Sequence, residues 1–462
     1  MQRSLLSGGN WNNGANAGVF NSNGNNARSN ANGNVGFRSA LPSSQILQTQ
    51  GFAFSAKVDK GRCLRGNNCR KTFAIDADVP GETPSLRRLQ HKAIEVSRME
   101  KYRHVFERFA TFENVYDGYL LARKNKRYQQ VVLEYSANLE DNIVTDVQRL
   151  NDGSYSPGAP HQFYEYFPKV RLIHSMPFQD RVLNCAAYNV LWPIYSRSMY
   201  EHSYGSIPDR GTAKCVNQVQ SWMQCCQRKP TQWYMVKMDI AKFFFRIPIN
   251  VQLEYLGRPL DDPRMMWFLE KAIRCDGRAF GLPIECTDVT TAERVAGIGM
   301  QVGSLISQVT ANVVMTPADF YIKRELRVPY YARYMDDMLA FLPSKEQAWD
   351  CMHATNEFLE TKLGLQLNKK TAVLPVGETI EFVGRRISPK KIELRKSTSL
   401  QMKRHLAWVM EHYSRGELPI EYCLNVIQSY LGLLKHCNND ALRNSVLDTF
   451  VLVRNKRGEE NE

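Results

Sequence analysis

Residues 330–342 read YYARYMDDMLAFL, and this stretch decides the fold. Two short apolar runs flank an acidic pair, Asp336 and Asp337, which is typical of a β-hairpin with a tight turn. Adjacent carboxylates at a hairpin tip repel each other and lose hydration when they are covered. For such a pair alone, a solvated acidic turn is the simpler interpretation. The apolar flanks and a second acidic site upstream favour a site where a divalent cation neutralises the pair.

That second site ends another apolar run. Residues 233–240 read WYMVKMDI, which places Asp239 at the end of a predicted strand. A lone aspartate there is usually a cap or a turn residue. Together with Asp336 and Asp337 it makes a set of carboxylates that can hold two Mg²⁺ ions and leave room for phosphates. Phosphoryl transfer from a nucleoside triphosphate needs such metal charge near the attacking and leaving oxygens. In this interpretation Asp239 and Asp336 bridge the metals, and Asp337 supports one of them.

Size and charge restrict the function classes. The chain has 462 residues and a net charge of +14. That length allows roughly two or three subdomains, and the charge attracts polyanions, with nucleic acid as the default candidate. Charge alone does not separate nucleic acid from a membrane surface, but no apolar run approaches the roughly 20 residues that a membrane span needs. The start of the chain lacks a signal-peptide pattern. The 11 cysteines lack paired CxxC motifs, so we expect reduced thiols in the cytoplasm.

Composition and periodicity divide the chain. We expect residues 1–41, rich in Asn and Gly, to be disordered, and residues 42–84 to be a linker. Helical patterns begin near residue 85 and return after residue 395, around an α+β region. Three apolar faces are predicted to lie on helices: Val131, Tyr135, Leu139, Ile143 and Val147; Leu400, His405, Val409 and Tyr413; Tyr422, Ile427, Tyr430 and Leu433.

The acidic sites and their surroundings resemble reverse transcriptases of the group II intron-like kind found in bacteria and phages. Residues 239–244 resemble motif A of that family, and residues 334–337 (YMDD) resemble motif C. The other resembling segments, in family order, are 169–173 and 177–182 (first fingers motif), 203–212 (second fingers motif), 363–371 (motif D) and 380–387 (motif E, the primer grip). The match covers roughly residues 85 to 450.

This resemblance implies an α+β right-hand polymerase. The expected domains are fingers with N-terminal helices at 85–232, a palm with motifs A to E at 233–394, and a helical thumb and tail at 395–462. The implied enzyme is an RNA-directed DNA polymerase, a nucleotidyltransferase that extends a 3′-OH on an RNA template with dNTPs. Its cofactor would be Mg²⁺, as two ions, with Mn²⁺ as a substitute. No segment is expected for an RNase H or an HNH endonuclease.

The resemblance also assigns roles to residues. Asp239, Asp336 and Asp337 are the expected catalytic residues, and with Ile240 they are the expected metal-binding residues. The expected primer-grip residues are Phe382, Val383 and Gly384.

Other residues are expected to bind the dNTP. Lys169 and Arg171 would meet the triphosphate, although a basic pair beside a strand is often a solvated face. Phe244 occupies the steric-gate position, where a bulky ring rejects a ribose 2′-OH; a plain core aromatic is the alternative. Lys370 would neutralise the leaving pyrophosphate, with Lys369 as an adjacent competitor.

Motif B indicates which kind of reverse transcriptase the chain resembles. Residues 299–312 read GMQVGSLISQVTAN. Gly303 would give a flexible entry to a helix that buries Leu305, Val309 and Val313. Most reverse transcriptases have Gln before that Gly and Pro after the later Ser, whereas this chain has Val302 and Gln308. The pattern resembles reverse transcriptases of diversity-generating retroelements, and it places all three of Val302, Gly303 and Gln308 near the dNTP. Valine cannot hydrogen-bond near the nascent pair, so checking weakens and misincorporation rises; a neutral packing substitution is the alternative.

The implied function is the copying of a template RNA into error-prone cDNA for targeted mutagenesis of a variable gene. Residues 9–20 and 27–38 resemble the variable tail of a C-type-lectin-type target protein, so the template repeat could be read in frame with the polymerase; an Asn-rich flexible tail is the alternative. The expected partners are template RNA, the cDNA primer–template hybrid, dNTPs and a basic accessory variability protein, with no membrane. The expected location is the bacterial cytoplasm, for a cellular or a phage-encoded protein.

Two rival functions remain open. One is a retron-like or anti-phage defence reverse transcriptase without a mutagenic role, which the altered motif B disfavours. The other is a nucleic-acid-binding scaffold with an inactive polymerase fold, which the intact Asp239, Asp336 and Asp337 disfavour.

Overall fold

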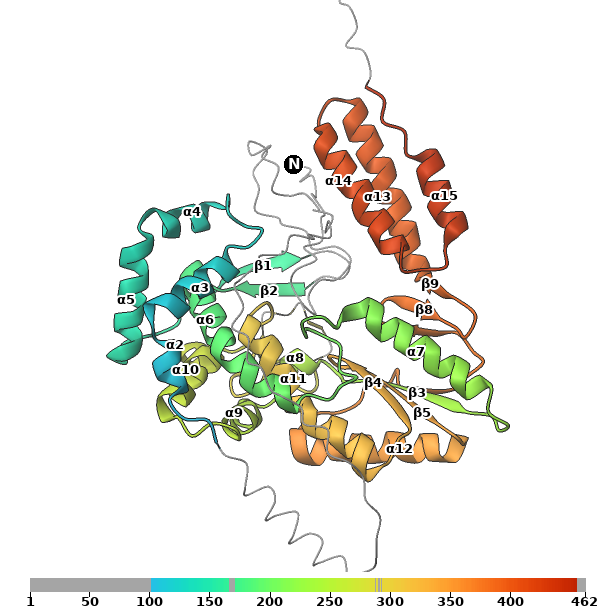
Figure 1. The fold of residues 1–462 in the computed structure, drawn as a ribbon, viewed down its shortest axis with the longest axis horizontal. Coiled ribbons are helices and arrows are strands. Elements are labelled where there is room, and N and C mark those ends of the chain that lie inside the picture. The colour runs from blue at the N-terminus through green and yellow to red at the C-terminus, as the bar shows by residue number, and fades with distance from the viewer. Residues whose placement is uncertain (1–100, 166–170, 287, 290, 292, 455–462) are drawn as a thin grey trace, which may run out of the picture. The chain divides into compact units, whose positions relative to one another are not determined.

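The chain folds into helices interspersed with short antiparallel strands (Figure 1). The computed structural model describes residues 101–454, apart from 166–170, 287, 290 and 292. The predicted segments 1–41 and 42–84, and Lys169, lie outside the described residues, as does the side chain of Arg171. The α+β class predicted from the sequence is confirmed.

The helices are α2 (Val105–Phe109), α3 (Phe112–Ala122), α4 (Gln130–Ala137), α5 (Leu139–Asn151), α6 (Phe178–Tyr195), α7 (Gly211–Gln227), α8 (Phe243–Arg246), α9 (Ile249–Gly257), α10 (Pro263–Arg274), α11 (Leu305–Phe320), α12 (Lys345–Phe358), α13 (Lys396–Ser414), α14 (Ile420–Leu434) and α15 (Asp440–Thr449). The strands are β1 (His161–Glu165), β2 (Arg171–Ser175), β3 (Tyr234–Asp239), β4 (Tyr330–Tyr334), β5 (Asp337–Leu342), β6 (Ala372–Pro375), β7 (Ile380–Phe382), β8 (Arg385–Ile387) and β9 (Ile392–Leu394).

A four-stranded antiparallel sheet lies at the centre of the described residues. Its strand order is β4-β5-β3-β6, so the two strands that carry the acidic residues are neighbours. β4 and β5 form the predicted hairpin, which is confirmed. Two separate small sheets pair β1 with β2, and β8 with both β7 and β9.

Different helices cover the two faces of the central sheet. Side chains alternate between the faces of a strand, so Leu339 and Phe341 pack with residues of α7, whereas Met338 and Ala340 belong to the core that contains residues of α11 and α12. Contacts of α12 with β3 and β5, and of α7 with β4, agree with this arrangement. The sheet is therefore covered on both faces over most of its length. Its functional side chains can reach a substrate only at the ends of the strands.

The helical region before the sheet differs from the prediction in one place. One helical face was predicted from Val131 to Val147, but Asn138 has φ −126° and ψ 50° and separates α4 from α5. The Nδ2 of Asn142 donates to the carbonyl oxygen of Tyr135 at 2.9 Å, which satisfies an acceptor at the end of α4. Tyr135 and Ile143 of the predicted face are buried, whereas Val131 is exposed.

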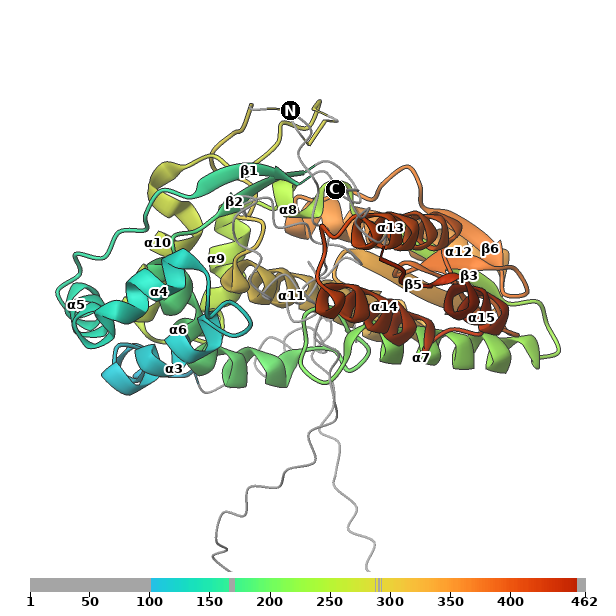
Figure 2. The ribbon, with the colours of Figure 1, turned by 90° about the horizontal axis from the view of Figure 1, so that it is seen from above.

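The last three helices enclose a core of their own, and Figure 2 shows α13 and α14 running side by side. The face predicted for α14 is confirmed, because Tyr422, Ile427, Tyr430 and Leu433 are all buried. The face predicted for α13 is partly wrong: Leu400 is exposed, and Met402 and Leu406 are buried with Val409 and Tyr413 instead. Nine residues, about two and a half helical turns, separate Leu400 from Val409, so the two side chains lie on opposite faces of α13.

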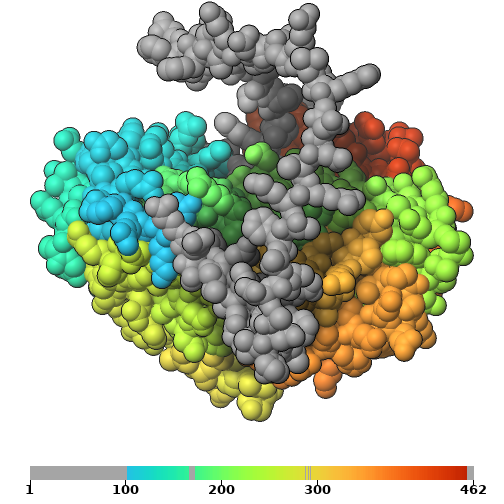
Figure 3. All heavy atoms as spheres, turned by 60° about the horizontal axis from the view of Figure 1, so that its bottom comes forward, coloured from blue at the N-terminus to red at the C-terminus, as the bar shows by residue number. Residues whose placement is uncertain are grey.

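In Figure 3 the surface of residues about 100 to 150 (blue to cyan) and that of α12 and its neighbours (orange) lie on opposite sides of the view.

Among the helices of the described residues, none is both long and apolar enough to cross a membrane.

Candidate active site

The acidic turn is a two-residue connection. Tyr334 and Asp337 are the last Cα partners of the hairpin, so Met335 and Asp336 alone link the strands. Met335 has φ 56°, in the left-handed region that residues other than glycine seldom adopt. Its side chain is nonetheless buried. The turn thus holds a strained backbone in place, a feature that is common at functional sites.

Asp239 stands directly opposite Asp337. The two are Cα partners at the matched ends of β3 and β5, and opposed residues of an antiparallel pair project from the same face. Asp336 precedes Asp337 in the turn. The structure therefore brings the predicted carboxylates to one edge of the central sheet, from two neighbouring strands.

A residue that the sequence analysis did not single out orients Asp239. Nδ2 of Asn368 donates to Oδ2 of Asp239 at 3.1 Å, and the backbone N–H of Asn368 donates to the Asp239 carbonyl oxygen at 2.6 Å. Oδ1 of Asn368 also accepts from the backbone N–H of Lys370 at 3.2 Å. Asn368 lies in the quoted motif D segment, but only folding reveals that this segment reaches the end of β3.

Asp337 lies near Cys215, the fifth residue of α7: burial raises the pKa of the Cys215 thiol, and the charge of Asp337 raises it further. The hydroxyl of Thr212, in the first turn of α7, donates to the Tyr334 hydroxyl at 3.4 Å. The segment predicted as the second fingers motif therefore packs against the acidic turn.

The donor set at this edge suits a hard divalent cation. Carboxylate oxygens are the ligands that Mg²⁺ prefers, and it needs few of them from protein. Ile240 is buried, so its backbone carbonyl is the group it could offer. Within the described residues, no three side chains of His, Cys, Asp or Glu are already close enough to form a metal cluster. The suitability of this site for a divalent cation therefore rests on the opposed Asp239 and Asp337 and on the neighbouring Asp336.

Phe244 is anchored on the short helix α8. Its ring is partly buried and meets Phe243 edge to face, with ring centroids 5.4 Å apart. Its carbonyl oxygen accepts from the backbone N–H of Met300 at 2.7 Å, which ties the predicted gate to motif B. Both the gate and the core-aromatic interpretations remain compatible with a partly buried ring.

Motif B forms a loop followed by a helix, as predicted. Gly303 has φ 104°, which favours glycine, and Ser304 precedes α11. Val309 and Val313 are buried, whereas Leu305 is only partly so. Gln308 is buried in the first turns of α11, and Val302 is partly buried before Gly303.

The structure gives less information on the basic residues that are expected to bind the triphosphate and the pyrophosphate. Arg171 begins β2, opposite Glu165. Lys369 and Lys370 are both exposed, so neither is favoured over the other by burial.

At the predicted primer grip, Phe382 is 1% exposed and packs in the core. The part left near the surface is the two-residue turn of Val383 and Gly384, with φ 48° and 74°. Two consecutive positive φ values are typical of a type I′ hairpin turn.

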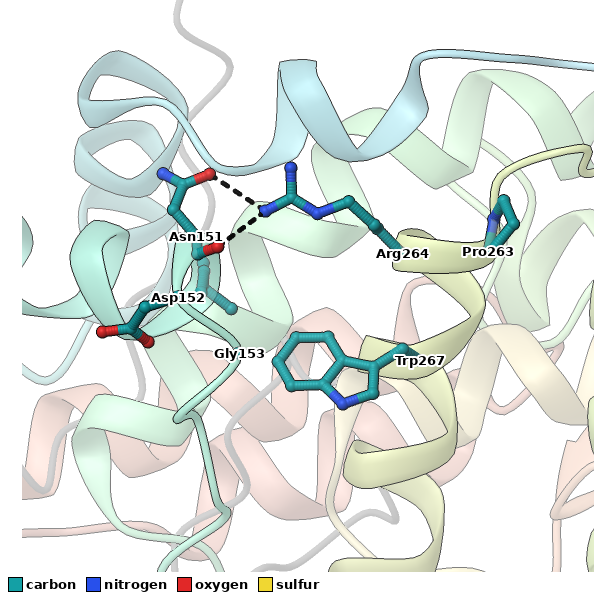
Figure 4. Close-up of a pocket in the computed structure, with 7 residues that line it drawn as sticks. Asn151, Asp152, Gly153, Pro263, Arg264 and Trp267 are labelled. Carbon is teal, nitrogen blue, oxygen red and sulfur yellow. Dashed lines mark hydrogen bonds between the residues drawn. The ribbon is translucent and has the colours of Figure 1, made fainter.

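A surface hollow elsewhere contains none of the predicted residues (Figure 4). It lies between the end of α5 and the start of α10, and it is lined by Leu150, Asn151, Asp152, Gly153, Pro263, Arg264 and Trp267. Nη2 of Arg264 already donates to the carbonyl oxygen of Asn151 at 3.0 Å and to its Oδ1 at 3.2 Å. This pairing closes the polar side of the hollow, so we assign it no role.

Comparison with known proteins assigns part of the chain to a known family. The family model described as reverse transcriptase (RNA-dependent DNA polymerase) matches residues 166–387, a range that includes both acidic strands. That range therefore forms a reverse transcriptase domain, the domain of RNA-directed DNA polymerases. The predicted enzyme class is confirmed at this level, as is the mixed helix and antiparallel-sheet architecture of a right-hand polymerase.

Individual relatives are distant. Protein YkfC of Escherichia coli strain K12 is 22% identical over 292 residues, which cover 55% of this chain and 74% of that protein. The putative COX1/OXI3 intron 2 protein of Saccharomyces cerevisiae is 19% identical over 262 residues, 45% of this chain and 29% of that protein. The relation to an intron protein is therefore confirmed only as a remote one.

Two solved telomerase structures are also similar. One, from Candida albicans with a fragment of telomeric RNA, has a TM-score of 0.37 at 13% identity and covers 64% of this chain and 55% of its own. The other is apo telomerase from Candida tropicalis, truncated from its C-terminal domain. It has a TM-score of 0.36 at 12% identity, and the match covers 55% of this chain and 60% of the telomerase chain. Likenesses this loose carry no functional inference.

Proposed function

We propose that this protein copies a template RNA into error-prone cDNA that mutates a variable gene, as in a diversity-generating retroelement. The observation that carries the polymerase part is the direct opposition of Asp239 and Asp337 at the ends of β3 and β5, with Asp336 in the adjoining turn. The mutagenic part is supported by motif B, where Val302 stands before Gly303 and Gln308 follows in α11.

In this proposal the acidic edge binds the metal-bound triphosphate. Asp239, Asp336, Asp337 and the carbonyl oxygen of Ile240 would supply the oxygen ligands. Two Mg²⁺ ions, or Mn²⁺ in their place, supply charge neutralisation at the attacking and leaving oxygens. Asn368 keeps the carboxylate of Asp239 in one orientation through its 3.1 Å bond.

The remaining predicted residues select and hold the substrates. Phe244 excludes a ribose 2′-OH, and exposed Lys370 or Lys369 neutralises the leaving pyrophosphate. Lys169 and Arg171 meet the triphosphate. The surface turn of Val383 and Gly384 contacts the primer strand.

The proposed partners follow from the same function. A net charge of +14 favours template RNA and the primer–template hybrid, which are held through backbone charge and shape. A basic accessory protein and a bacterial cytoplasmic location are carried over from the family resemblance.

Primer extension on an RNA template tests the polymerase role. We expect Asp336→Asn to reduce extension to the background of a reaction without enzyme, because it removes a carboxylate charge and keeps the side-chain volume. Asp350→Asn is the matched control, because Asp350 is an exposed acid on α12 outside the site. Equal extension by wild type and Asp336→Asn would refute the role of the acidic turn.

Sequencing of cDNA made on the cognate RNA tests the mutagenic role. We expect wild-type substitutions to cluster at template adenines, and Val302→Gln to reduce them, because Gln restores a polar group near the nascent pair. An even, low error rate in the wild type would leave a polymerase without the mutagenic role, as in the retron-like alternative.

A further inference from the structure

A buried ion pair joins the acidic hairpin to the helix of motif B. Asp319 of α11 and Arg333 of β4 are both fully buried. Nε and Nη2 of Arg333 donate to Oδ1 and Oδ2 of Asp319, each at 2.8 Å. This two-pronged geometry holds the planar guanidinium in one orientation.

The remaining nitrogen of that guanidinium reaches the acidic turn. Nη1 of Arg333 donates to the carbonyl oxygen of Met335 at 3.1 Å and to Oδ1 of Asn312 at 3.2 Å. Asn312 lies on α11, and its Nδ2 donates to the carbonyl oxygen of Gly205 at 2.9 Å. One set of hydrogen bonds therefore connects the turn, α11 and the loop around Gly205.

The turn is also confined by close packing. A Cβ atom at Gly205 would lie 2.5 Å from Cγ and 2.8 Å from the backbone nitrogen of Met335. Met335 keeps its φ of 56° under this constraint. Strain of this kind costs about 1–3 kcal/mol and persists only where the surroundings enforce it.

Stability alone does not explain the ion pair. Burial lowers the pKa of Arg333, but the charge and hydrogen bonds of Asp319 outweigh it and leave that pKa raised, with a contribution from Asp336. The guanidinium is therefore charged, and a buried charge pair is often no more stabilising than apolar side chains of similar volume. What apolar side chains could not do is donate a hydrogen bond to the turn.

We propose that Asp319, Arg333 and Asn312 are positioning residues that hold the acidic turn, and so set where Asp336 and Asp337 stand relative to Asp239. The inference rests on the proposed function, because it concerns the same carboxylates. It also links the turn to α11, whose first turns carry Gln308. A displacement of that helix would reach the carboxylates through two side chains.

The test uses the full chain and the double variant Arg333→Met, Asp319→Leu, which removes both buried charges together. Direct Mn²⁺ binding is measured by electron paramagnetic resonance without nucleotide or nucleic acid. We expect Mn²⁺ to bind about tenfold or more weakly than in wild type, the usual effect of losing a residue that orients metal ligands. We expect the Mg²⁺ concentration for half-maximal extension to rise in parallel, while the KM for dNTP at saturating Mg²⁺ stays unchanged.

Arg333→Lys gives a graded comparison, because lysine keeps the charge but cannot bond to Asp319 and Met335 in the same planar fork. We expect its Mn²⁺ affinity to fall between those of wild type and the double variant. Tyr135→Phe is the control, because it loses a buried tyrosine–aspartate bond in α4, away from the turn. It should lower stability and leave Mn²⁺ affinity at the wild-type value.

Wild-type Mn²⁺ affinity in a folded double variant overturns the proposal. If the double variant does not fold, Asn312→Ala, which keeps the ion pair, is measured in the same way, and unchanged Mn²⁺ affinity there overturns the proposal too. Failure of the proposed function looks different: wild type would bind Mn²⁺, lose it in Asp336→Asn, and yet extend no primer. Weaker Mn²⁺ binding by the double variant would still support the positioning role in that case.

Discussion

Asp319 and Asp146 are both fully buried, and each accepts a hydrogen bond from a buried tyrosine. Tyr331 donates to Asp319 at 2.9 Å, and Tyr135 donates to Asp146 at 3.0 Å. Their remaining partners differ. Asp319 faces the two-pronged guanidinium of Arg333 at 2.8 Å. Asp146 accepts from the neutral amide of Gln179, and its cation, Nη1 of the partly exposed Arg149, lies 3.8 Å away.

This difference separates two kinds of support. Burial raises the pKa of Asp146 to about 6, although hydrogen bonds from Gln179 and Tyr135 counteract part of the effect. Asp146 joins α5 to α6 and α4, and its burial favours the protonated form of its carboxyl. Asp319 connects α11 to the acidic turn. Its negative charge balances that of Arg333, which donates a hydrogen bond to the backbone carbonyl of Met335 in the turn. The comparison teaches that burial alone does not define the role of a carboxylate; the distance and geometry of its countercharge do.

The largest expected effect is that of Asp319→Asn. The substitution leaves the guanidinium of Arg333 buried without a countercharge, which costs about 3–5 kcal/mol. The free energy of unfolding from urea titration measures it. A loss below about 1 kcal/mol would mean that the pair behaves as a surface ion pair, and the contrast with Asp146 would disappear.

A pH titration of stability isolates Asp146. Its pKa in the folded protein is raised from 3.8 to about 6, so the folded state binds the proton more tightly than the unfolded chain. That contribution is complete below pH 3.8 and is lost as the pH rises through about 6. It amounts to about 3 kcal/mol at most.

The measurement is the difference in unfolding free energy between wild type and Asp146→Asn at several pH values. Because asparagine does not titrate, the difference should shift against wild type between pH 4 and 7, by roughly the amount above. A difference that is flat across this range would show that the carboxylate has the same pKa in the folded and unfolded states.

Gly205→Ala separates the position of the turn from the ion pair. The new methyl group would overlap the Met335 backbone, so the turn must move while Asp319 and Arg333 keep their charges. We expect a stability loss of about 1–3 kcal/mol and slower primer extension. Gly432→Ala is the control, because Gly432 is exposed on α14 and nothing lies within 4 Å of its added Cβ. If Gly205→Ala extends primers as fast as wild type, the rate of primer extension does not depend on the exact position of the acidic turn.

The smallest effects should come from the two tyrosines. Tyr331→Phe and Tyr135→Phe each delete one hydroxyl bond to a buried aspartate, a net contribution of about 0.5–1.5 kcal/mol. We expect the cost of Tyr135→Phe to be smaller at pH 5 than at pH 8, because a bond to a neutral carboxyl is weaker than one to a carboxylate. Unfolding curves at the two pH values measure it. Equal costs at both would indicate that Asp146 does not change charge in this range.

Local patterns were sufficient for β3, β4 and β5 and for the acidic residues at their ends. Apolar runs around Asp336 predicted the hairpin, because a two-residue turn between β-forming segments is a short-range signal. The apolar run before Asp239 predicted β3 in the same way. The periodic face of α14 also held, since it is covered along its length by neighbouring helices.

Patterns failed where a distant segment decides the outcome. Nothing local distinguishes Asn138, which follows the end of α4, from an ordinary helical asparagine. The error at Leu400 was one of helical period, because about two and a half turns separate it from the buried Val409. The packing of the Phe382 ring in the core that contains residues of α7 was not predicted, and its primer-grip role stays a prediction. Asn368 became part of the site only because motif D returns to the end of β3.

By itself, the sequence determined the secondary structure of the acidic strands, the order of the motifs and the chemical class of the domain, because these depend on residue type and short spacing. Tertiary structure alone decided that Asp239 stands opposite Asp337, that Gly205 confines Met335, and that Asp319 gives Arg333 its countercharge. Such relations join residues far apart in the chain. They arise when the sheet register and the packing of α11 are formed together, and no local signal encodes them.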